Sequence, residues 1–205
     1  MRQKRVRDAT PETMTLMGVL HDMTPAALPD KPIHLEIGSG KGKFITGLAA
    51  DNPDIHYIAL EQNINVCYRI AQKKESMGLE NLTVILDKAE NIVHYLGTRK
   101  AERLFLMFSD PWPKARHHKR RLTYPRYLSY YMSFLSESAT IVFRTDHADF
   151  FEDSLLYFHG LMTIEDVSYD LPEGPHMTEY EEKKRDTGPI HQLIAKVNTH
   201  AQTDL

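Results

Sequence analysis

Five short apolar runs alternate with longer segments suited to helices, and this alternation strongly restricts the fold. The runs cover residues 33–37, 55–60, 82–86, 104–108 and 139–143. A strand that is repeatedly followed by a helix predicts a parallel sheet with helices on both faces. Two further strand-like segments, at 162–170 and 190–197, are joined by a polar loop and predict an antiparallel hairpin at the end of the chain. The sequence therefore predicts an α/β fold with seven strands, mostly parallel.

Acidic residues lie at the ends of four of the apolar runs. They are Glu36, Glu61, Asp110 and Asp146. Parallel strands bring their carboxyl ends to one edge of a sheet, and ligands of open α/β folds bind at that edge. We therefore expect the four carboxylates to share the edge that binds a ligand, with Glu61 placed to accept both hydroxyls of a ribose.

The segment from Gly38 to Lys43 is a glycine-rich turn that opens a helix. Glycines allow close approach of a ligand to the backbone, and the start of the helix offers free N–H groups. A phosphate-binding P-loop would need Ser or Thr where the chain has Phe44, and a dinucleotide fold would need glycine in place of Lys43. An acid followed by Gly-x-Gly, as in Glu36 to Gly40, is typical of S-adenosylmethionine methyltransferases.

A stiff turn carries Asp110 and opens a cationic segment. Pro111 and Pro113 fix the backbone of this turn. From Lys114 to Arg126 the chain has six Lys or Arg, two His and no acid. Such a block repels itself unless it meets an anion, although a solvated surface turn is the alternative interpretation. Because the whole chain has a formal net charge of −3, any anion binding must be local.

Length and composition predict one domain at residues 33–205, preceded by a mobile basic arm at residues 1–32. The cations of the arm are Arg2, Lys4, Arg5 and Arg7. Cys67 is the single cysteine, which excludes an internal disulfide, and the chain has no Cys/His cluster that would predict a metal site. No apolar run approaches the roughly 20 residues that span a bilayer, so we expect a cytoplasmic protein without a membrane partner.

Four segments, taken together, resemble the bacterial tRNA (guanine-N7)-methyltransferases. They are LEIGSGKGKF at 35–44, FSDPWPKARHHKRRL at 108–122, FRTDH at 143–147 and TEYEEKK at 178–184. The segments follow the order of the family, and the second is the most specific. The resemblance implies a single Rossmann-like methyltransferase domain. It also implies transfer of a methyl group from S-adenosylmethionine to N7 of a guanosine in the variable loop of tRNA.

The same resemblance implies roles for individual residues. The cofactor would be bound by Glu36, Gly38, Gly40, Glu61, Asp87 and Asp110. Asp110 would also be the catalytic residue at the reaction centre. The guanine nucleotide would be contacted by Lys114, Asp146, Thr178, Glu179, Tyr180 and Glu181. The RNA backbone would be bound by Arg116, His117, His118, Lys119, Arg120 and Arg121.

The chain departs from the family pattern at the end of the third strand. The family usually has Asp or Asn where this chain has Lys88, and Asp87 comes one residue earlier. A lysine cannot accept a hydrogen bond from the adenine amino group. Either a local bulge brings Asp87 into place, or backbone and apolar contacts hold the adenine.

The implied partner is tRNA, and the implied state is a monomer or a homodimer. Two alternatives stay open. The first is an S-adenosylmethionine-dependent methyltransferase that acts on another acceptor, against which the cationic segment after Asp110 argues if that acceptor is small. The second is a non-catalytic RNA-binding protein on the same fold.

Overall fold

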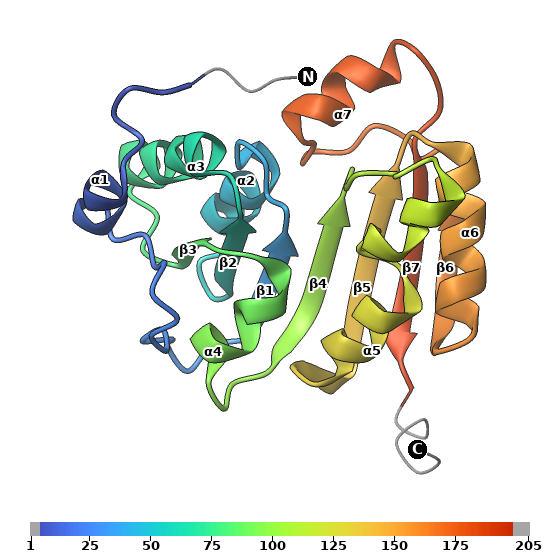
Figure 1. The fold of residues 1–205 in the computed structure, drawn as a ribbon, viewed down its shortest axis with the longest axis horizontal. Coiled ribbons are helices and arrows are strands. Elements are labelled where there is room, and N and C mark those ends of the chain that lie inside the picture. The colour runs from blue at the N-terminus through green and yellow to red at the C-terminus, as the bar shows by residue number, and fades with distance from the viewer. Residues whose placement is uncertain (1–4, 199–205) are drawn as a thin grey trace. The chain divides into compact units, whose positions relative to one another are not determined.

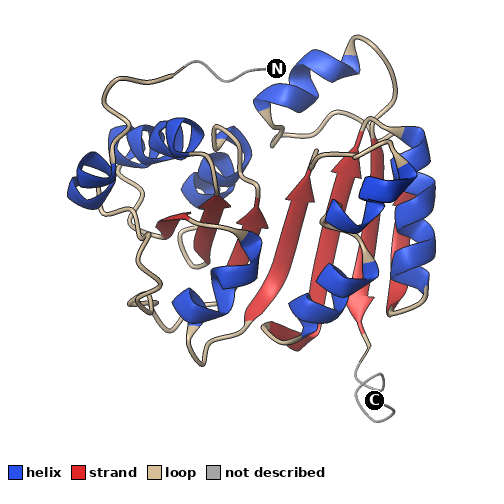
Figure 2. Cartoon of the chain, viewed as in Figure 1, coloured by secondary structure: helices blue, strands red, loops and turns tan. Residues whose placement is uncertain are grey.

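A computed structural model describes residues 5–198, and the chain divides into two compact units. The first unit comprises the chain up to Arg99 together with residues 176–179. The second comprises residues 100–175 and the chain from Tyr180 onward. Each unit has its own strands, flanking helices and apolar core (Figures 1 and 2).

The first unit is built on a parallel sheet in the order β3-β2-β1. The strands are β1 (Ile33–Ile37), β2 (His56–Glu61) and β3 (Leu82–Leu86). Their flanking helices are α2 (Lys43–Asp51), α3 (Ile64–Met77), the short 3-10 helix η1 (Ala89–Asn91) and α4 (Ile92–Leu96). The strand side chains Leu35, Ile58 and Ile85 are fully buried, as expected for a parallel sheet covered by helices.

Helix α3 has clear start and stop signals in the sequence. The side chain of Asn63 accepts a hydrogen bond from the backbone N–H of Asn65 at 3.0 Å and so caps the first turn. Gly78 ends the helix in the left-handed conformation, with φ 62°. These two caps place α3 directly after the carboxyl end of β2.

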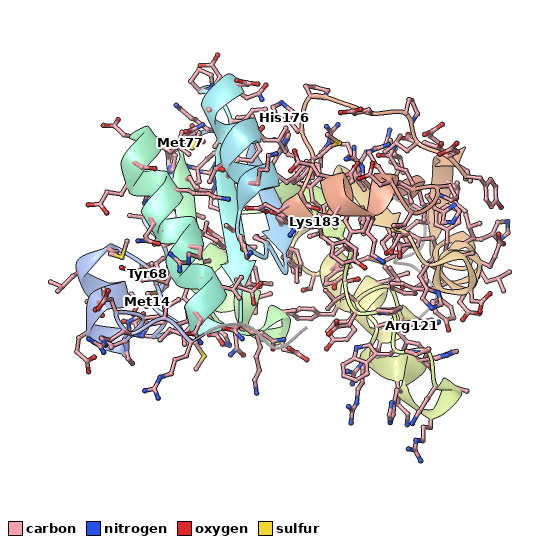
Figure 3. All side chains as sticks on the ribbon, turned by 90° about the horizontal axis from the view of Figure 1, so that it is seen from above. Met14, Tyr68, Met77, Arg121, His176 and Lys183 are labelled. Atoms are coloured by element: carbon pink, nitrogen blue, oxygen red, sulfur yellow. The ribbon has the colours of Figure 1, made fainter. Side chains whose placement is uncertain are left out.

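The N-terminal segment packs onto the first unit. Helix α1 (Pro11–Leu16) buries Met14 completely, and Figures 1 and 3 show α1 beside α3, with Met14 near Tyr68. Leu20 forms a parallel bridge with Ile85 of β3. The described part of residues 1–32 is therefore ordered against the core, which differs from the mobile arm that we expected. The predicted basic positions Arg2 and Lys4 lie outside the described residues.

The second unit has four strands in the order β4-β5-β7-β6. They are β4 (Ala101–Met107), β5 (Leu135–Thr145), β6 (Met162–Ser168) and β7 (His191–Val197). β4 and β5 are parallel, whereas β7 pairs antiparallel with both β5 and β6. The helices of this unit are the 3-10 helix η2 (Ala115–Arg120), α5 (Pro125–Met132), α6 (Ala148–His159) and, from Tyr180 onward, α7 (Glu179–Arg185).

The predicted α/β class, with seven strands and an antiparallel pair at the end of the chain, is confirmed. Two elements were not predicted. The cationic segment forms η2, and the polar loop near residue 180 forms α7. The fifth strand is also longer than its apolar run, because it begins at Leu135. Among residues 5–198, no helix is long and apolar enough to cross a membrane.

Candidate active site

The glycine-rich turn after β1 has a backbone that only glycine adopts without strain. Gly38, Gly40 and Gly42 have φ of 78°, 54° and 81°. Gly42 is also restricted by packing, since a Cβ atom there would lie 3.0 Å from Ile70 of α3. The N–H of Gly40 donates to Glu61 Oε2 at 3.1 Å, which joins the turn to the end of β2.

Glu36 is a buried carboxylate within β1, one residue before the strand ends. Its side chain is fully buried, and neither of its oxygens has a hydrogen-bond partner among the described residues. Burial, with smaller contributions from the negative charges of Glu61 and Glu179, raises the pKa of Glu36 to about 8. A buried, unpaired carboxylate is costly unless a ligand brings a donor or a positive charge.

Glu61 closes β2 and connects two backbone segments. Its Oε2 accepts from Gly40, and its Oε1 accepts from the N–H of Asn63 at 2.9 Å. The carboxylate therefore lies between the glycine-rich turn and the start of α3. This is the position from which an acid can accept ribose hydroxyls in a Rossmann-like fold.

Asp87 directly follows β3 and is held by local hydrogen bonds. Oδ1 accepts from the N–H of Lys88 at 2.7 Å and from Asn91 Nδ2 at 2.8 Å, while Oδ2 accepts from the Tyr95 hydroxyl at 2.7 Å. Burial acts to raise the pKa of Asp87, but these hydrogen bonds lower it overall. Three donors leave one acceptor position of the carboxylate for an adenine amino group. Lys88, at the usual acidic position, is exposed.

Thr178 and Glu179 belong to the first unit. Glu179 forms a close ion pair with Lys73 of α3. In the same segment, His176 Nε2 lies 3.3 Å from Asp51 Oδ2, and its ring lies against Gly47 of α2. Lys73 was not predicted to belong to the site, because a surface lysine on a helix gives no sign of a partner 106 residues away.

The second unit carries Asp110 on a strained turn after β4. Phe108 and Trp112 have φ of 52° and 41°, although neither is glycine. Such residues occur where the surroundings hold an unfavourable backbone, often at functional sites. The Asp110 side chain is exposed, and the buried hydroxyl of Ser109 has no hydrogen-bond partner in residues 5–198.

The cationic segment after Asp110 is mostly exposed. Its exposed cations are Lys114, Arg116, Lys119, Arg120 and Arg126, whereas His117 and His118 are half-buried. The guanidinium of Arg120 lies over the ring of Trp112, 5.0 Å from its centroid, and the ring of His117 meets Trp112 edge-on at 5.8 Å. Three of the exposed cations, Arg116, Lys119 and Arg120, are therefore presented by the 3-10 helix η2, which contacts the Asp110 turn through Trp112.

Arg121 differs from the other cations of the segment. Its side chain is only 1% exposed and is paired with Asp153 of α6. A guanidinium enclosed in this way has no free face for a phosphate. The burial argues against our expectation that Arg121 contacts RNA, and we leave this residue out of the proposed interface.

Asp146 directly follows β5 and is paired with α7. Its Oδ2 accepts from the Tyr180 hydroxyl at 3.2 Å and forms an ion pair with Lys184 at 3.1 Å. The Tyr180 ring lies 5.3 Å from that of Phe108, at the end of β4. Burial, together with the charge of Asp146, raises the pKa of Tyr180.

Glu181 is buried between two arginines. Its side chain is fully buried, with Oε2 3.2 Å from Arg144 Nη1 and Oε1 2.5 Å from Arg185 Nη2. Arg185 also donates to the carbonyl of Leu171 at 2.7 Å. These contacts argue against the expected contact between Glu181 and the guanine nucleotide. They indicate that Glu181 fixes α7.

We expect Glu181→Gln to destabilise the fold, because it leaves Arg144 and Arg185 without their buried counter-charge. The expected loss in the free energy of unfolding is about 3 kcal/mol. Urea unfolding followed by circular dichroism measures it, with the exposed neighbour Glu182→Gln as the control. A loss below about 0.5 kcal/mol would contradict the structural role of Glu181.

The structure thus distributes the expected residues over both units. The first holds Glu36, Gly38, Gly40, Glu61, Asp87, Thr178 and Glu179. The second holds Asp110, the cationic segment, Asp146, Tyr180 and Glu181. Within the first unit, three acids lie at or directly after the carboxyl ends of three parallel strands. Within the second, Asp110 and Asp146 follow the ends of the parallel pair β4 and β5.

Comparison with known proteins gives the family. A family model described as "Putative methyltransferase" matches residues 30–193. A tRNA (guanine-N(7)-)-methyltransferase of Bacillus velezensis is 44% identical over 177 residues, which cover 83% of this chain and 81% of the relative. One from Lachnoclostridium phytofermentans is 43% identical, with 81% of each chain covered. The chain belongs to the tRNA (guanine-N(7)-)-methyltransferase family.

Solved structures with low sequence identity share the fold of this methyltransferase family. A 16S rRNA methyltransferase superposes with a TM-score of 0.63 at 15% identity, covering 95% of this chain and 97% of its own. A plantazolicin methyltransferase in complex with a substrate analogue and SAH gives a TM-score of 0.54 at 14% identity, and the match covers 80% of this chain and 76% of that one. The Rossmann-like methyltransferase fold implied by the sequence motifs is therefore confirmed.

Proposed function

We propose that this protein transfers a methyl group from S-adenosylmethionine to N7 of a guanosine in tRNA, in the variable loop. The observation that supports this most is that one exposed carboxylate, Asp110, is followed in the chain by a set of exposed cations on η2, in a member of this family. We include in the proposal the cytoplasmic location and the monomeric or homodimeric state that we expected from the sequence.

The residues of the first unit fit the cofactor. Glu36 offers an unpaired buried carboxylate to a positively charged ligand. The carboxylate of Glu61 can accept hydrogen bonds from ribose hydroxyls, and Gly40, which is bonded to it, lets the ligand approach the backbone closely. Asp87 keeps one acceptor position for the adenine. When bound, S-adenosylmethionine supplies an electrophilic methyl group on a sulfonium sulfur. The chain contributes the orientation of this group through these contacts.

Methylation at N7 makes specific demands on the protein. Guanine N7 has an exposed lone pair and no proton, so the reaction requires no general base. The product base carries positive charge, which a carboxylate beside the base stabilises more strongly than it stabilises neutral guanine. We assign this role to Asp110, the exposed acid of its turn. Acceptors such as Asp110 or Asp146 also suit the N1–H and amino group of guanine, which adenine does not offer.

The exposed cations are suited to phosphates. Lys114, which we assign to the guanine nucleotide, opens the segment, and Arg116, Lys119 and Arg120 follow it within one 3-10 helix. Contacts to phosphates supply affinity and register but no sequence information. Tyr180 keeps 47% of its surface exposed and offers a face on which an extruded base can stack. Thr178 and Glu179 stay in the proposed guanosine-binding set.

We expect Arg116→Ala combined with Arg120→Ala to weaken tRNA binding and to flatten its salt dependence. Each phosphate contact that is lost removes about one unit from the slope of log affinity against log salt, so the double variant should lose about two. Filter binding across a salt series measures the slope. The matched control replaces Arg103 and Lys196, two exposed cations on β4 and β7, by alanine. An unchanged slope in the first variant would remove both arginines from the interface.

The acceptor atom is tested with tRNA transcripts that contain 7-deazaguanosine, in which carbon replaces N7. We expect these transcripts to bind with nearly unchanged affinity and to accept no methyl group, while ordinary transcripts are methylated. Methylation of the deaza transcript at a normal rate would exclude N7 as the acceptor. It would favour another atom or nucleoside.

A further inference from the structure

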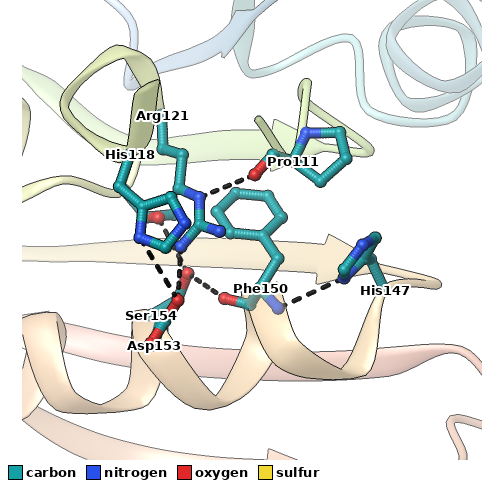
Figure 4. A network of polar contacts seen from close by, with 8 residues as sticks. Pro111, His118, Arg121, His147, Phe150, Asp153 and Ser154 are labelled. Carbon is teal, nitrogen blue, oxygen red and sulfur yellow. Dashed lines mark hydrogen bonds and ion pairs between the residues drawn. The ribbon is translucent and has the colours of Figure 1, made fainter. Parts of the chain in front are cut away.

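A buried arginine in the second unit connects the Asp110 turn to α6. Arg121 Nε donates to the carbonyl oxygen of Pro111 at 2.6 Å, and Nη1 donates to Asp153 Oδ2 at 2.6 Å (Figure 4). Its guanidinium also lies over the ring of Phe150, 4.9 Å from the centroid. One planar cation therefore contacts the turn and the helix at the same time.

The helix end of this connection is itself fixed. The side chains of Thr123 and Ser154 are hydrogen-bonded at 2.7 Å, and Ser154 donates to the carbonyl of Phe150 at 2.7 Å. His118 Nδ1 lies 3.7 Å from the same Asp153 oxygen that Arg121 contacts (Figure 4). Arg121 is thus bound to a part of α6 that further side-chain contacts hold in place.

The turn end of the connection is the part that needs support. Pro111 lies between Asp110 and Trp112, and the backbone of Trp112 has a positive φ, as does that of Phe108. Pro111 and Pro113 have no N–H with which to bond the turn to its surroundings. A backbone in these conformations persists only where neighbouring groups hold it. The hydrogen bond from Arg121 is such a support, one residue from Asp110.

We propose that Arg121 and Asp153 form a positioning pair that holds the turn in the conformation from which Asp110 acts. Arg121 orients the Pro111 carbonyl, and Asp153 orients Arg121 and balances its charge. The pair touches the substrate at neither end. This inference rests on the proposed role of Asp110, but its effect on the turn does not depend on that role.

Two substitutions test the pair while they preserve packing. Asp153→Asn keeps the shape and one acceptor but removes the charge, and Arg121→Lys keeps the charge but cannot make both bonds in a fixed plane. Asp149→Asn, at an exposed position of the same helix, is the control. We expect either test variant to lower kcat at least tenfold, with the affinity for S-adenosylmethionine and the salt slope of tRNA binding unchanged.

A double-mutant cycle separates positioning from general destabilisation. If the pair acts through Asp110, Asp153→Asn causes little further loss of single-turnover rate in an Asp110→Asn background. A tenfold loss that persists in that background would overturn the proposal. So would a kcat within twofold of the wild type in both single variants.

Trp112 gives a measurement that needs no activity. It is the only tryptophan of the chain and lies in the turn. We expect Asp153→Asn to shift its emission and to increase its quenching by acrylamide well below the melting temperature, and Asp149→Asn to leave both unchanged. If the wild type transfers no methyl group yet Trp112 responds in this way, the proposed function fails while the anchoring of the turn stands. An unchanged Trp112 signal in both test variants would refute the anchoring itself.

Discussion

Asp110→Asn is expected to lower the rate of methyl transfer at least about a hundredfold while leaving the fold intact. Within residues 5–198 the exposed carboxylate of Asp110 forms no hydrogen bond or ion pair that the substitution would remove, and the amide has nearly the same shape. Its charge is the property that matters, since positive charge develops on the guanine ring as N7 gains the methyl group. The amide removes that charge and keeps the volume.

The measurement is a single-turnover rate with enzyme in excess over tRNA transcript, together with the dissociation constant for S-adenosylmethionine. We expect the rate to fall and the dissociation constant to change less than threefold. Asp166→Asn, on the exposed face of β6, is the matched control and should behave as wild type. A rate for Asp110→Asn within tenfold of the wild type would remove Asp110 from the reaction centre.

Glu36→Gln is expected to remove the pH dependence that the buried carboxylate gives to cofactor binding. Because the folded pKa of Glu36 is raised to about 8, the apo protein holds this group protonated at neutral pH. A positively charged ligand binds the ionised form, so binding below pH 8 must release a proton. The wild-type affinity should therefore rise about tenfold for each pH unit between about 6 and 8 relative to the variant.

The quantity to measure is the ratio of the dissociation constants of the wild type and Glu36→Gln for S-adenosylmethionine. Protonation of the ligand itself affects both constants equally and cancels in the ratio. Titration calorimetry at pH 6, 7 and 8 gives the ratio, and buffers of different ionisation enthalpy report the proton release. Glu80→Gln, at an exposed position, is the control. A ratio that stays constant across this range would place the cofactor's charge away from Glu36.

The same group predicts a stability change with a definite sign. A carboxyl whose folded pKa lies above its unfolded value binds more protons in the folded state, so its contribution to stability falls as pH rises from about 4.5 to about 8. We therefore expect apo Glu36→Gln to melt at a higher temperature than the wild type at pH 8, with the difference closing near pH 5. A wild type that melts higher at pH 8 would contradict the burial of an unpaired charge.

The elements that sequence reasoning placed well are those whose signals are local. β1 and β3 coincide with the short apolar runs from which we predicted them, and α3 runs between the Asn63 cap and Gly78. The acids near the carboxyl ends of β1 and β2 were also placed correctly, because parallel strands bring these ends to the same edge of a sheet. Hydrophobic periodicity and turn residues predict these features from the local sequence, without contacts to residues distant in the chain.

The features that were missed depend on partners distant in the sequence. α7 has the sequence EYEEKKR, with no apolar stripe, and depends on Glu181 reaching Arg144, 37 residues earlier. The burial of Arg121 depends on Asp153, 32 residues later, so nothing within the cationic segment distinguishes it from Arg120. Its burial indicates a structural role for one cation to which the resemblance had implied an RNA contact.

The most direct test of the proposed activity is the transfer of labelled methyl groups from S-adenosylmethionine to unmodified tRNA transcripts, followed by digestion to nucleosides. We predict that the label appears in 7-methylguanosine and that its position maps to the variable loop. Label in another nucleoside, or no transfer by protein shown to bind S-adenosylmethionine, would contradict the proposed function.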